Sequence, residues 1–313
     1  MAKRTFSRIY LASRIPEEQI GSWEGKHAEE HHYDFVVNGN AKIYDAKTKE
    51  PIAILVRNIF DEGTLKENFE GAYPALRKFR DDKNFWSDNR GKYSGQIERI
   101  HKVKKDGTIS RQGRCKSVAT GLAGYYETLG GRFKYPRETK YLQKYPELWE
   151  TLIPVFRICG AWMQTVCKQR YEVQMDAVKK TSKDWVIPGT PFTTIAVNNC
   201  VAAAYHKDNR DLKEGMGCMF VHRRGQYEGF ELVIPEYRFA IDMRHGDVLF
   251  FNPCVWHSNI PPRNAVGEEA EDWERISVVM YFRKNLLKEP SKEEALERVK
   301  QKESERYMSL GDV

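Results

Sequence analysis

The spacing of hydrophobic and polar positions changes along the chain, and each spacing predicts a different kind of element. Before residue 60, short apolar runs separated by turn residues predict three extended segments, at 35–37, 41–44 and 52–56. The pair Asn38-Gly39 between the first two runs is a strong hairpin signal. Over residues 64–81, large apolar side chains recur at spacings of three and four, which predicts helical structure.

The longest helical pattern follows Pro146, and strand periodicity replaces it at about residue 186. Apolar residues from Leu148 to Val166 share one helical face, and Pro154 and Gly160 are expected to bend this helix. Further along, short apolar segments predict strands at 192–197, 217–221, 230–234, 238–241, 247–251 and 276–282. These strands favour an antiparallel sandwich or barrel, and the charged tail after them is compatible with one polar helix.

Composition places the chain in an ordinary globular class. Of its 313 residues, 41% are apolar and 30% are charged, which excludes disorder over the whole length. No stretch approaches the roughly 18 uninterrupted apolar residues of a membrane span, and no apolar signal segment follows the first residues. The six cysteines include no CxxC pair, which favours reduced thiols. We expect an intracellular protein, in the host cytoplasm if viral or the nucleus if eukaryotic.

The net charge of +7 is concentrated in one segment. Residues 98–116 hold seven basic and two acidic residues, a local charge of +5, so the rest of the chain carries only +2. A segment with this charge is suited to bind the phosphates of a nucleic acid. The alternative is a charged loop that is only solvated. It lacks interleaved aromatic residues, which favours duplex backbone contact over single-strand stacking. The candidate phosphate contacts are Lys102, Lys104 and Lys105.

Two histidines and one aspartate form a pattern typical of a metal site. His206 and Asp208 follow an apolar strand and, two residues apart, can face the same ion, while His257 follows a later strand. Two histidines and one carboxylate fit a facial triad for Fe(II), for which a jelly roll is the usual scaffold. Arg275 and Ser277 open the last strand on one face, where a guanidinium can bind the distal carboxylate of a 2-oxoacid.

The alternative interpretation makes His206 and Asp208 a surface pair and His257 a core histidine. The other histidines are expected to have no site role. His222 alternates with strand residues and is expected to be solvated, and His245 precedes Gly246 in a turn.

Four stretches of the chain together resemble a known enzyme family: residues 192–208, 227–237, 245–251 and 275–281. They are similar to the ten-eleven-translocation and J-binding-protein (TET/JBP) oxygenases, most of all to the compact viral, phage-type members. The resemblance implies an α+β fold with a double-stranded β-helix (jelly-roll) core, N-terminal flanking helices and a C-terminal helix. It also implies Fe(II), 2-oxoglutarate and O2 as cosubstrate, with iron ligands at His206, Asp208 and His257 and the cosubstrate arginine at Arg275.

The resemblance also implies residues that contact the DNA base. Asn89-Arg90 resembles a family motif that would place Arg90 near the cosubstrate and Asn89 near the base, with a simple loop turn as the alternative. Asp211 stands where the family reads the flipped base, and Tyr281 is a candidate to stack on it or to be a core tyrosine. Arg283 replaces a histidine of animal TET proteins, and their cysteine-rich zinc region is absent. The carboxylate of Asp211 can accept a hydrogen bond from the cytosine N4 amine, whereas thymine offers only the O4 acceptor at that position, which favours 5-methylcytosine. The alternative is that Asp211 is an exposed loop residue.

These observations predict a single catalytic domain that converts 5-methylcytosine in duplex DNA to 5-hydroxymethylcytosine after base flipping. Within it, residues 1–185 would form a support and DNA-facing region, 186–286 the jelly roll, and 287–313 the C-terminal helix. The alternatives are thymine hydroxylation to 5-hydroxymethyluracil, oxygenation of a protein or small molecule, and a non-catalytic module that binds modified bases. We expect a monomer without membrane association. The acidic residues 267–272 are not assigned a role.

Overall fold

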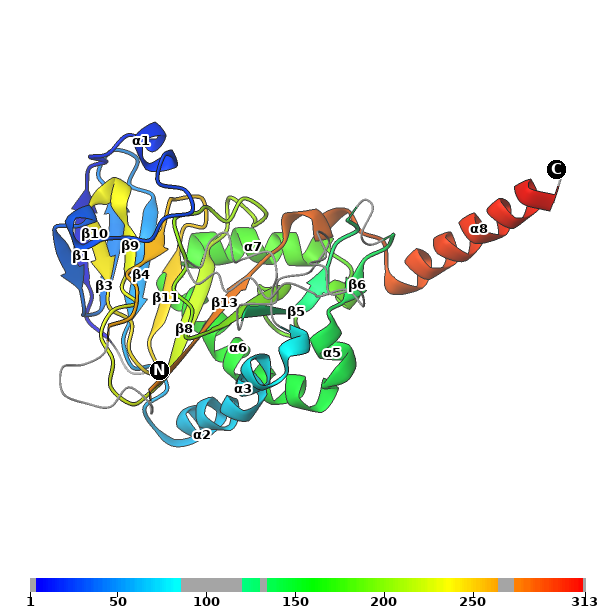
Figure 1. Cartoon of the computed structure of the whole chain (residues 1–313), viewed down its shortest axis with the longest axis horizontal. Helices are drawn as coiled ribbons and strands as arrows, with labels where there is room; N and C mark the ends of the chain where they lie inside the picture. The colour runs from blue at the N-terminus through cyan, green and yellow to red at the C-terminus, as the bar shows by residue number, and fades with distance from the viewer. Residues whose placement is uncertain (1–3, 86–119, 130–133, 264–272, 312–313) are drawn as a thin grey trace, which may run out of the picture.

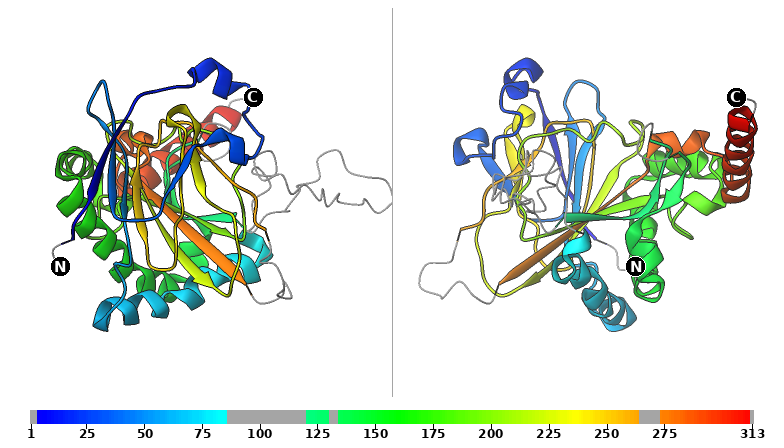
Figure 2. Two further views of the ribbon diagram at one scale, coloured as in Figure 1. Left: turned by 90° about the vertical axis from the view of Figure 1, so that its left-hand side faces the viewer. Right: turned by 45° about the vertical axis from the view of Figure 1, so that its right-hand side comes forward.

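Two β-sheets face each other, and a layer of helices covers the outer face of the larger one (Figure 1). This computed structural model describes residues 4–85, 120–129, 134–263 and 273–311. Two further views show the cyan and green helices, between residues 63 and 180, gathered against one side of the strands (Figure 2). No helix in the described residues is both long enough and apolar enough to cross a membrane.

The larger sheet contains nine of the described strands and supplies most of the scaffold. Its neighbours are antiparallel except for the first two, which are parallel. In spatial order the strands are β1 (Ser7–Leu11), β3 (Ala41–Asp45), β4 (Pro51–Val56), β11 (Val248–Phe251), β8 (Gly217–Arg224), β13 (Glu274–Tyr281), β7 (Thr194–Asn199), β5 (Thr120–Tyr126) and β6 (Arg137–Glu138).

The smaller sheet closes over one end of the larger one. Its strands, in order, are β12 (Ser258–Asn259), β9 (Leu232–Ile234), β10 (Phe239–Ile241) and β2 (Phe35–Val37). Side chains from both sheets, including Ile43, Leu249 and Phe239, form one buried apolar cluster between them. Because successive side chains of a strand point to opposite faces, the other face of the larger sheet needs its own cover.

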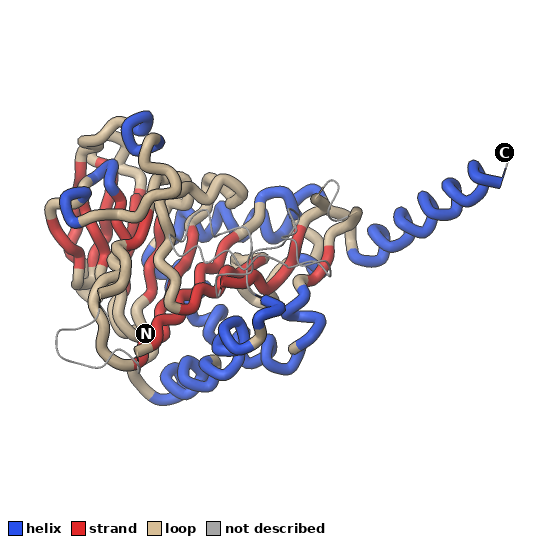
Figure 3. The backbone as a smooth tube through the Cα atoms, viewed as in Figure 1, coloured by secondary structure: helices blue, strands red, loops and turns tan. Residues whose placement is uncertain are grey.

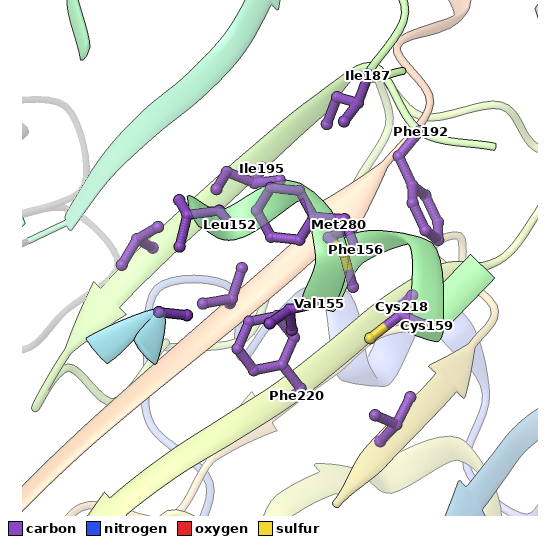
Figure 4. Packing of buried hydrophobic residues seen from close by; sticks show 14 of the residues in the cluster. Leu152, Val155, Phe156, Cys159, Ile187, Phe192, Ile195, Cys218, Phe220 and Met280 are labelled. Carbon is purple, nitrogen blue, oxygen red and sulfur yellow. The ribbon is translucent and has the colours of Figure 1, made fainter. Parts of the chain in front are cut away.

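Helices supply that cover. The described helices are α1 (Glu17–Gly21), α2 (Gly63–Gly71), α3 (Tyr73–Asp81), α5 (Lys140–Lys144), α6 (Pro146–Val166), α7 (Lys168–Lys180) and α8 (Lys292–Gly311). Phe156 and Cys159 of α6 pack against Ile195, Phe220 and Met280 of the central strands (Figure 4). Helix α8 instead projects away from the rest of the chain (Figure 3).

The strands expected after residue 186 are confirmed within a few residues at their ends, as are the long helix and the C-terminal helix. The hairpin expected at Asn38-Gly39 is wrong. Strand β2 belongs to the smaller sheet and β3 to the larger one, so this turn connects two sheets, and β3 pairs with β4 instead. The helical region 64–81 is divided at Ala72, and Pro74 lies in the first turn of α3, where its missing N–H costs nothing.

The N-terminal half contributes strands to both sheets. β1, β3, β4, β5 and β6 belong to the larger sheet, and β2 belongs to the smaller one. The basic segment 98–116 and the acidic residues 267–272 lie outside the described residues.

Candidate metal and cosubstrate site

His206 and His257 lie opposite each other at one end of the sandwich. The backbone N–H of each donates to the carbonyl oxygen of the other at 3.1 Å, so the two loops that follow β7 and β11 are joined at this point. The ring centroids are 4.3 Å apart. The N–H of Asp208 donates to the carbonyl oxygen of Pro253 at 2.9 Å, which fixes the carboxylate beside both rings.

The three side chains present their metal-binding atoms to a common point. The Asp208 Oδ1 lies 3.7 Å from the His206 Nε2, and its Oδ2 lies 3.6 Å from the His257 Nε2. The Nδ1 of His206 is 2.7 Å from the Ala204 carbonyl oxygen, and that of His257 is 2.9 Å from the Val255 carbonyl oxygen. A carbonyl can only accept, so each Nδ1 carries the ring proton and each Nε2 keeps its lone pair for a ligand.

This donor set fits Fe(II). The ligand atoms lie within 4.8 Å of one another, which is the spacing expected around one ion. Two neutral imidazoles and one carboxylate on a single side are the donors of non-haem Fe(II) sites that keep positions open for other ligands. The carbonyl contacts of both rings hold them in orientation, as partners of metal-ligating histidines commonly do.

A cavity of about 350 Å³ opens in front of these atoms. Its lining includes, besides the three ligand candidates, residues from β7, β8, β13, the segment just after β13 and the loop after His206: Asn198, Asp211, Met219, Ser277, Val279, Tyr281 and Arg283. Among the described candidates from the sequence, the three ligand candidates, Asp211, Ser277, Tyr281 and Arg283 line this cavity, whereas Arg275 is not one of its lining residues.

Arg275 is a buried cation that has no anionic partner among the described residues. Its side chain is 2% exposed, and its guanidinium lies over the Phe230 ring at 5.0 Å. Among the described residues, the guanidinium makes no hydrogen bond or ion pair, and its Nε is buried without an acceptor. Burial lowers the pKa of this group. Since an unpaired buried charge is costly, the site is suited to an anion such as the distal carboxylate of 2-oxoglutarate, and Ser277 lies on the same strand face.

Asp211 and Arg283 lie opposite each other at the other side of the cavity. They form an isolated backbone bridge, and both are buried, at 7% and 4% exposed. The exposed-loop interpretation of Asp211 is therefore wrong. The Arg283 guanidinium forms a two-pronged pair with Glu127, whose carboxylate is 1% exposed, and the Nη2–Oε1 distance is 2.8 Å. Burial opposes ionisation of Glu127, but the hydrogen bonds and charge of Arg283 outweigh it and lower its pKa.

The structure therefore fixes Arg283 rather than leaving it free. Its guanidinium is committed to Glu127, while its residue still lines the cavity beside Tyr281, which is 8% exposed. Sequence reasoning missed Glu127, because it follows β5 and is separated from its partner by 156 residues. A lone glutamate after an apolar strand was the only available signal.

The sequence reasoning also missed Arg223, which pairs in register with Arg275 across β8 and β13. Its Nη2 donates to the carbonyl oxygen of Tyr227 at 2.6 Å, and its guanidinium lies 4.0 Å from the centre of that ring. Arg223 and Arg275 are therefore neighbouring arginines on adjacent strands. The remaining candidates, Asn89, Arg90, Lys102, Lys104 and Lys105, lie outside the described residues.

The expectation for His222 is wrong. Its side chain is 1% exposed, stacks on Phe69 at 5.0 Å, and contacts the Tyr73 ring in a tilted arrangement at 4.9 Å. The alternation of β8 indicated an outward-facing position, but α2 and α3 cover that face, which periodicity alone does not reveal. His245 does lie in a turn, where Gly246 has a φ of 77°.

Comparison with known proteins relates this site to a family of oxygenases. Residues 121–284, slightly more than half of the chain, match the family model Tet_JBP, described as the oxygenase domain of the 2OGFeDO superfamily. Thymine dioxygenase JBP1 of Trypanosoma brucei brucei is 30% identical over 195 residues, which cover 62% of this chain and 22% of that protein. Thymine dioxygenase JBP1 of Leishmania braziliensis is 29% identical over 177 residues, which cover 56% and 21%. The chain therefore matches about a fifth of the length of these relatives.

A solved structure supports the fold. NgTET1 in complex with 5mC DNA has a TM-score of 0.51 and 13% sequence identity, with 92% of this chain and 100% of that chain covered. At this identity the likeness concerns the fold alone, and it confirms the expected α+β architecture with a jelly-roll core.

Proposed function

Because the chain belongs to the Tet_JBP family of 2-oxoglutarate- and Fe(II)-dependent oxygenases, we propose that it hydroxylates the 5-methyl group of 5-methylcytosine in DNA. Fe(II) and 2-oxoglutarate are the cofactors of this superfamily, with O2 as cosubstrate. The observation that carries the proposal is the His-Asp-His cluster at the cavity, together with a buried Arg275 that has no ion-pair partner among the described residues and stands two positions before the cavity-lining Ser277 on β13.

Different residues of the chain would bind the metal and the cosubstrate. His206, Asp208 and His257 would hold Fe(II), and Arg275 would bind the distal carboxylate of 2-oxoglutarate, assisted by the Ser277 hydroxyl. When bound, these cofactors activate O2, so that one oxygen atom converts the methyl group to CH2OH and the other enters succinate as CO2 leaves. The protein contributes the relative positions of the groups that line the cavity.

Asp211 supports 5-methylcytosine as the substrate base. Asp211 lines the cavity and is buried, and we propose that a flipped base entering there meets its carboxylate as a hydrogen-bond acceptor. Cytosine offers the N4 amine as donor, whereas thymine offers only the O4 acceptor. Tyr281 and Arg283 border the same space, and we propose that Tyr281 stacks on the base while Arg283, held by Glu127, shapes the pocket.

Thymine is the second candidate base, because both relatives compared above are named thymine dioxygenases. Either base must leave the duplex, since a stacked methyl group cannot reach a metal inside the sandwich. We further propose that the basic segment 98–116 binds the DNA backbone through Lys102, Lys104 and Lys105, and that Asn89 and Arg90 complete the base and cosubstrate sites.

The test is a product assay with two substrates. The chain is incubated with Fe(II), 2-oxoglutarate and duplexes that carry either 5-methylcytosine or only thymine, and hydroxymethylated nucleosides are quantified by mass spectrometry. The proposal predicts 5-hydroxymethylcytosine as the main product. Exclusive 5-hydroxymethyluracil would overturn the choice of base, and the absence of both would overturn DNA oxidation.

Two variants sharpen the assay. Asp211→Asn adds an amide donor suited to thymine O4, so the ratio of cytosine to thymine product should fall by about tenfold or more. The matched control is Glu214→Gln, an exposed carboxylate of the same loop, which should leave the ratio unchanged. Replacing Lys102, Lys104 and Lys105 by Glu should abolish DNA oxidation while leaving any DNA-independent succinate formation intact. Full DNA activity in that triple variant would instead favour a protein or small-molecule substrate.

A further inference from the structure

A second group of metal-ligand side chains lies on the opposite face of the larger sheet. It consists of Glu70 on α2, His222 on β8 and His245 in the turn before β11, and their ligand atoms all lie within 4.8 Å of one another. Met219 and His222 are three positions apart on β8, so their side chains point to opposite faces. Met219 lines the cosubstrate cavity, and the second group is therefore separate from it.

The carboxylate of Glu70 lies between the two imidazoles. Its Oε1 is 2.9 Å from the His245 Nε2, and its Oε2 is 3.3 Å from the His222 Nε2. The two rings are nearly perpendicular, with centroids 4.7 Å apart and an interplanar angle of 81°. Phe69 stacks on His222 and meets His245 edge-on, so both rings are held in place by packing.

His222 has no satisfactory partner for its ring nitrogens. The side chain is 1% exposed, and among the described residues neither its Nδ1 nor its Nε2 makes a hydrogen bond. Its Nε2 approaches Glu70 without the alignment that a hydrogen bond requires. Burial, followed by the nearby His245, lowers the pKa of His222 to about 4, so the ring is neutral at pH 7. A buried, neutral imidazole with an unused nitrogen beside a carboxylate can coordinate a metal ion without first losing a hydrogen bond.

We propose that Glu70, His222 and His245 form a binding site for a divalent first-row transition cation, with Zn²⁺ as the best fit. Two imidazole nitrogens and one carboxylate match the His2Glu set of zinc sites, whereas Mg²⁺ and Ca²⁺ prefer oxygen ligands. The side chains of Glu70 and His245 are 40% and 38% exposed, so water has access to a fourth position. The site lies outside the oxygenase cavity and does not depend on the proposed DNA substrate.

The protonation of His245 indicates how the cation would enter. Its Nδ1 accepts from the backbone N–H of Arg223 at 3.1 Å, so the ring proton is on Nε2 and is donated to Glu70. Coordination through Nε2 requires that proton to move to Nδ1, which breaks the contact with Arg223. Because of this cost, we expect the cation to exchange readily rather than to serve as a permanent structural ion. The hydrogen bond that is lost lies at Arg223, the residue that pairs with Arg275 across β8 and β13.

The experiment is a Co²⁺ titration of the tag-free, metal-stripped full chain, followed by the visible d–d absorption and by equilibrium dialysis. The wild-type chain should bind two equivalents, one at each site. The double variant His206→Ala, His257→Ala should retain one. The double variant Glu70→Gln, His245→Ala should also retain one, and the four substitutions combined should leave none.

The matched control is Glu29→Gln, His31→Ala. It removes an exposed Glu–His pair, 3.5 Å apart, that has no third ligand among the described groups, and it should leave two equivalents. Circular dichroism of the metal-free variants checks folding, and Glu70 and His245 are exposed enough to be replaced. The variant His222→Phe, which keeps a ring between Phe69 and Tyr73, should also lose one equivalent. A single equivalent in the wild-type chain, or a second equivalent that survives Glu70→Gln, His245→Ala, would overturn the proposal whatever the DNA assay shows.

Discussion

Replacing Arg275 by methionine should have opposite effects on stability and on cosubstrate binding. The guanidinium is 2% exposed and, within the described residues, unpaired, so the protein without cosubstrate bears the cost of a buried charge. Replacing a buried ion pair by apolar residues of similar volume is often neutral or stabilising by about 1–4 kcal/mol, and an unpaired buried charge has no Coulombic attraction to lose, so we expect a gain of similar size here. For a chain of this size, a change of 1 kcal/mol shifts the midpoint of thermal unfolding by about 2 °C, so the midpoint should rise by several degrees.

The loss in binding follows from the same geometry. A charge-assisted hydrogen bond contributes about 1.5–3 kcal/mol, and a guanidinium offers a carboxylate two of them. At about 1.4 kcal/mol per tenfold change, Arg275→Met should weaken 2-oxoglutarate binding by roughly two to four orders of magnitude. Calorimetric titration with Fe(II) in the absence of oxygen measures the affinity, and differential scanning calorimetry with and without 2-oxoglutarate measures both stabilities.

Arg223→Met is the matched control, because Arg223 faces Arg275 across the two strands. It already donates to the Tyr227 carbonyl and stacks on that ring, so its removal should lower the stability of the protein without cosubstrate. The reasoning would be refuted if Arg275→Met lowered that stability as Arg223→Met does, while the affinity for 2-oxoglutarate stayed the same. Such a result would mean that the guanidinium has a partner in the free protein.

Three further predictions concern buried carboxylates and the metal. Glu127→Gln leaves the Arg283 charge buried and should cost about 3–5 kcal/mol in urea unfolding, whereas Glu138→Gln, in an exposed pair, should cost less than about 1 kcal/mol. Burial opposes ionisation of Glu274, but its hydrogen bonds outweigh this effect and lower its pKa below the usual 4.5 in the folded protein. As pH falls, the unfolded chain therefore binds a proton at this position before the folded chain does. The free energy of unfolding should therefore decrease below about pH 4.5, and less steeply in Glu274→Gln. Asp208→Ala should lose Fe(II) and succinate formation, and chelation should do the same reversibly in the wild-type chain; iron content and turnover test both.

The candidate metal ligands could be found from the sequence because they occupy short motifs at strand ends. His206 and Asp208 are two residues apart, and an extended backbone directs such side chains to one face. Arg275 and Ser277 repeat that spacing on the last strand. The strands themselves could be placed because short apolar segments alternate with turn residues. The pairing of β2 could not be, since Asn38-Gly39 permits a hairpin but does not decide which sheet receives the next strand.

The sequence by itself determined the element types in the second half of the chain, the ligand chemistry of one site and the family to which it belongs. The tertiary structure alone decided which charges are buried and with what partners. Arg283 is buried with Glu127, Arg275 is buried without an ion-pair partner among the described residues, and His222 is buried beneath α2. The physical reason is that periodicity records only which face of an element a residue occupies. Whether that face meets solvent, a helix or a second sheet depends on contacts between segments far apart in the chain, and those contacts set the cost of a charge and the pKa of a histidine.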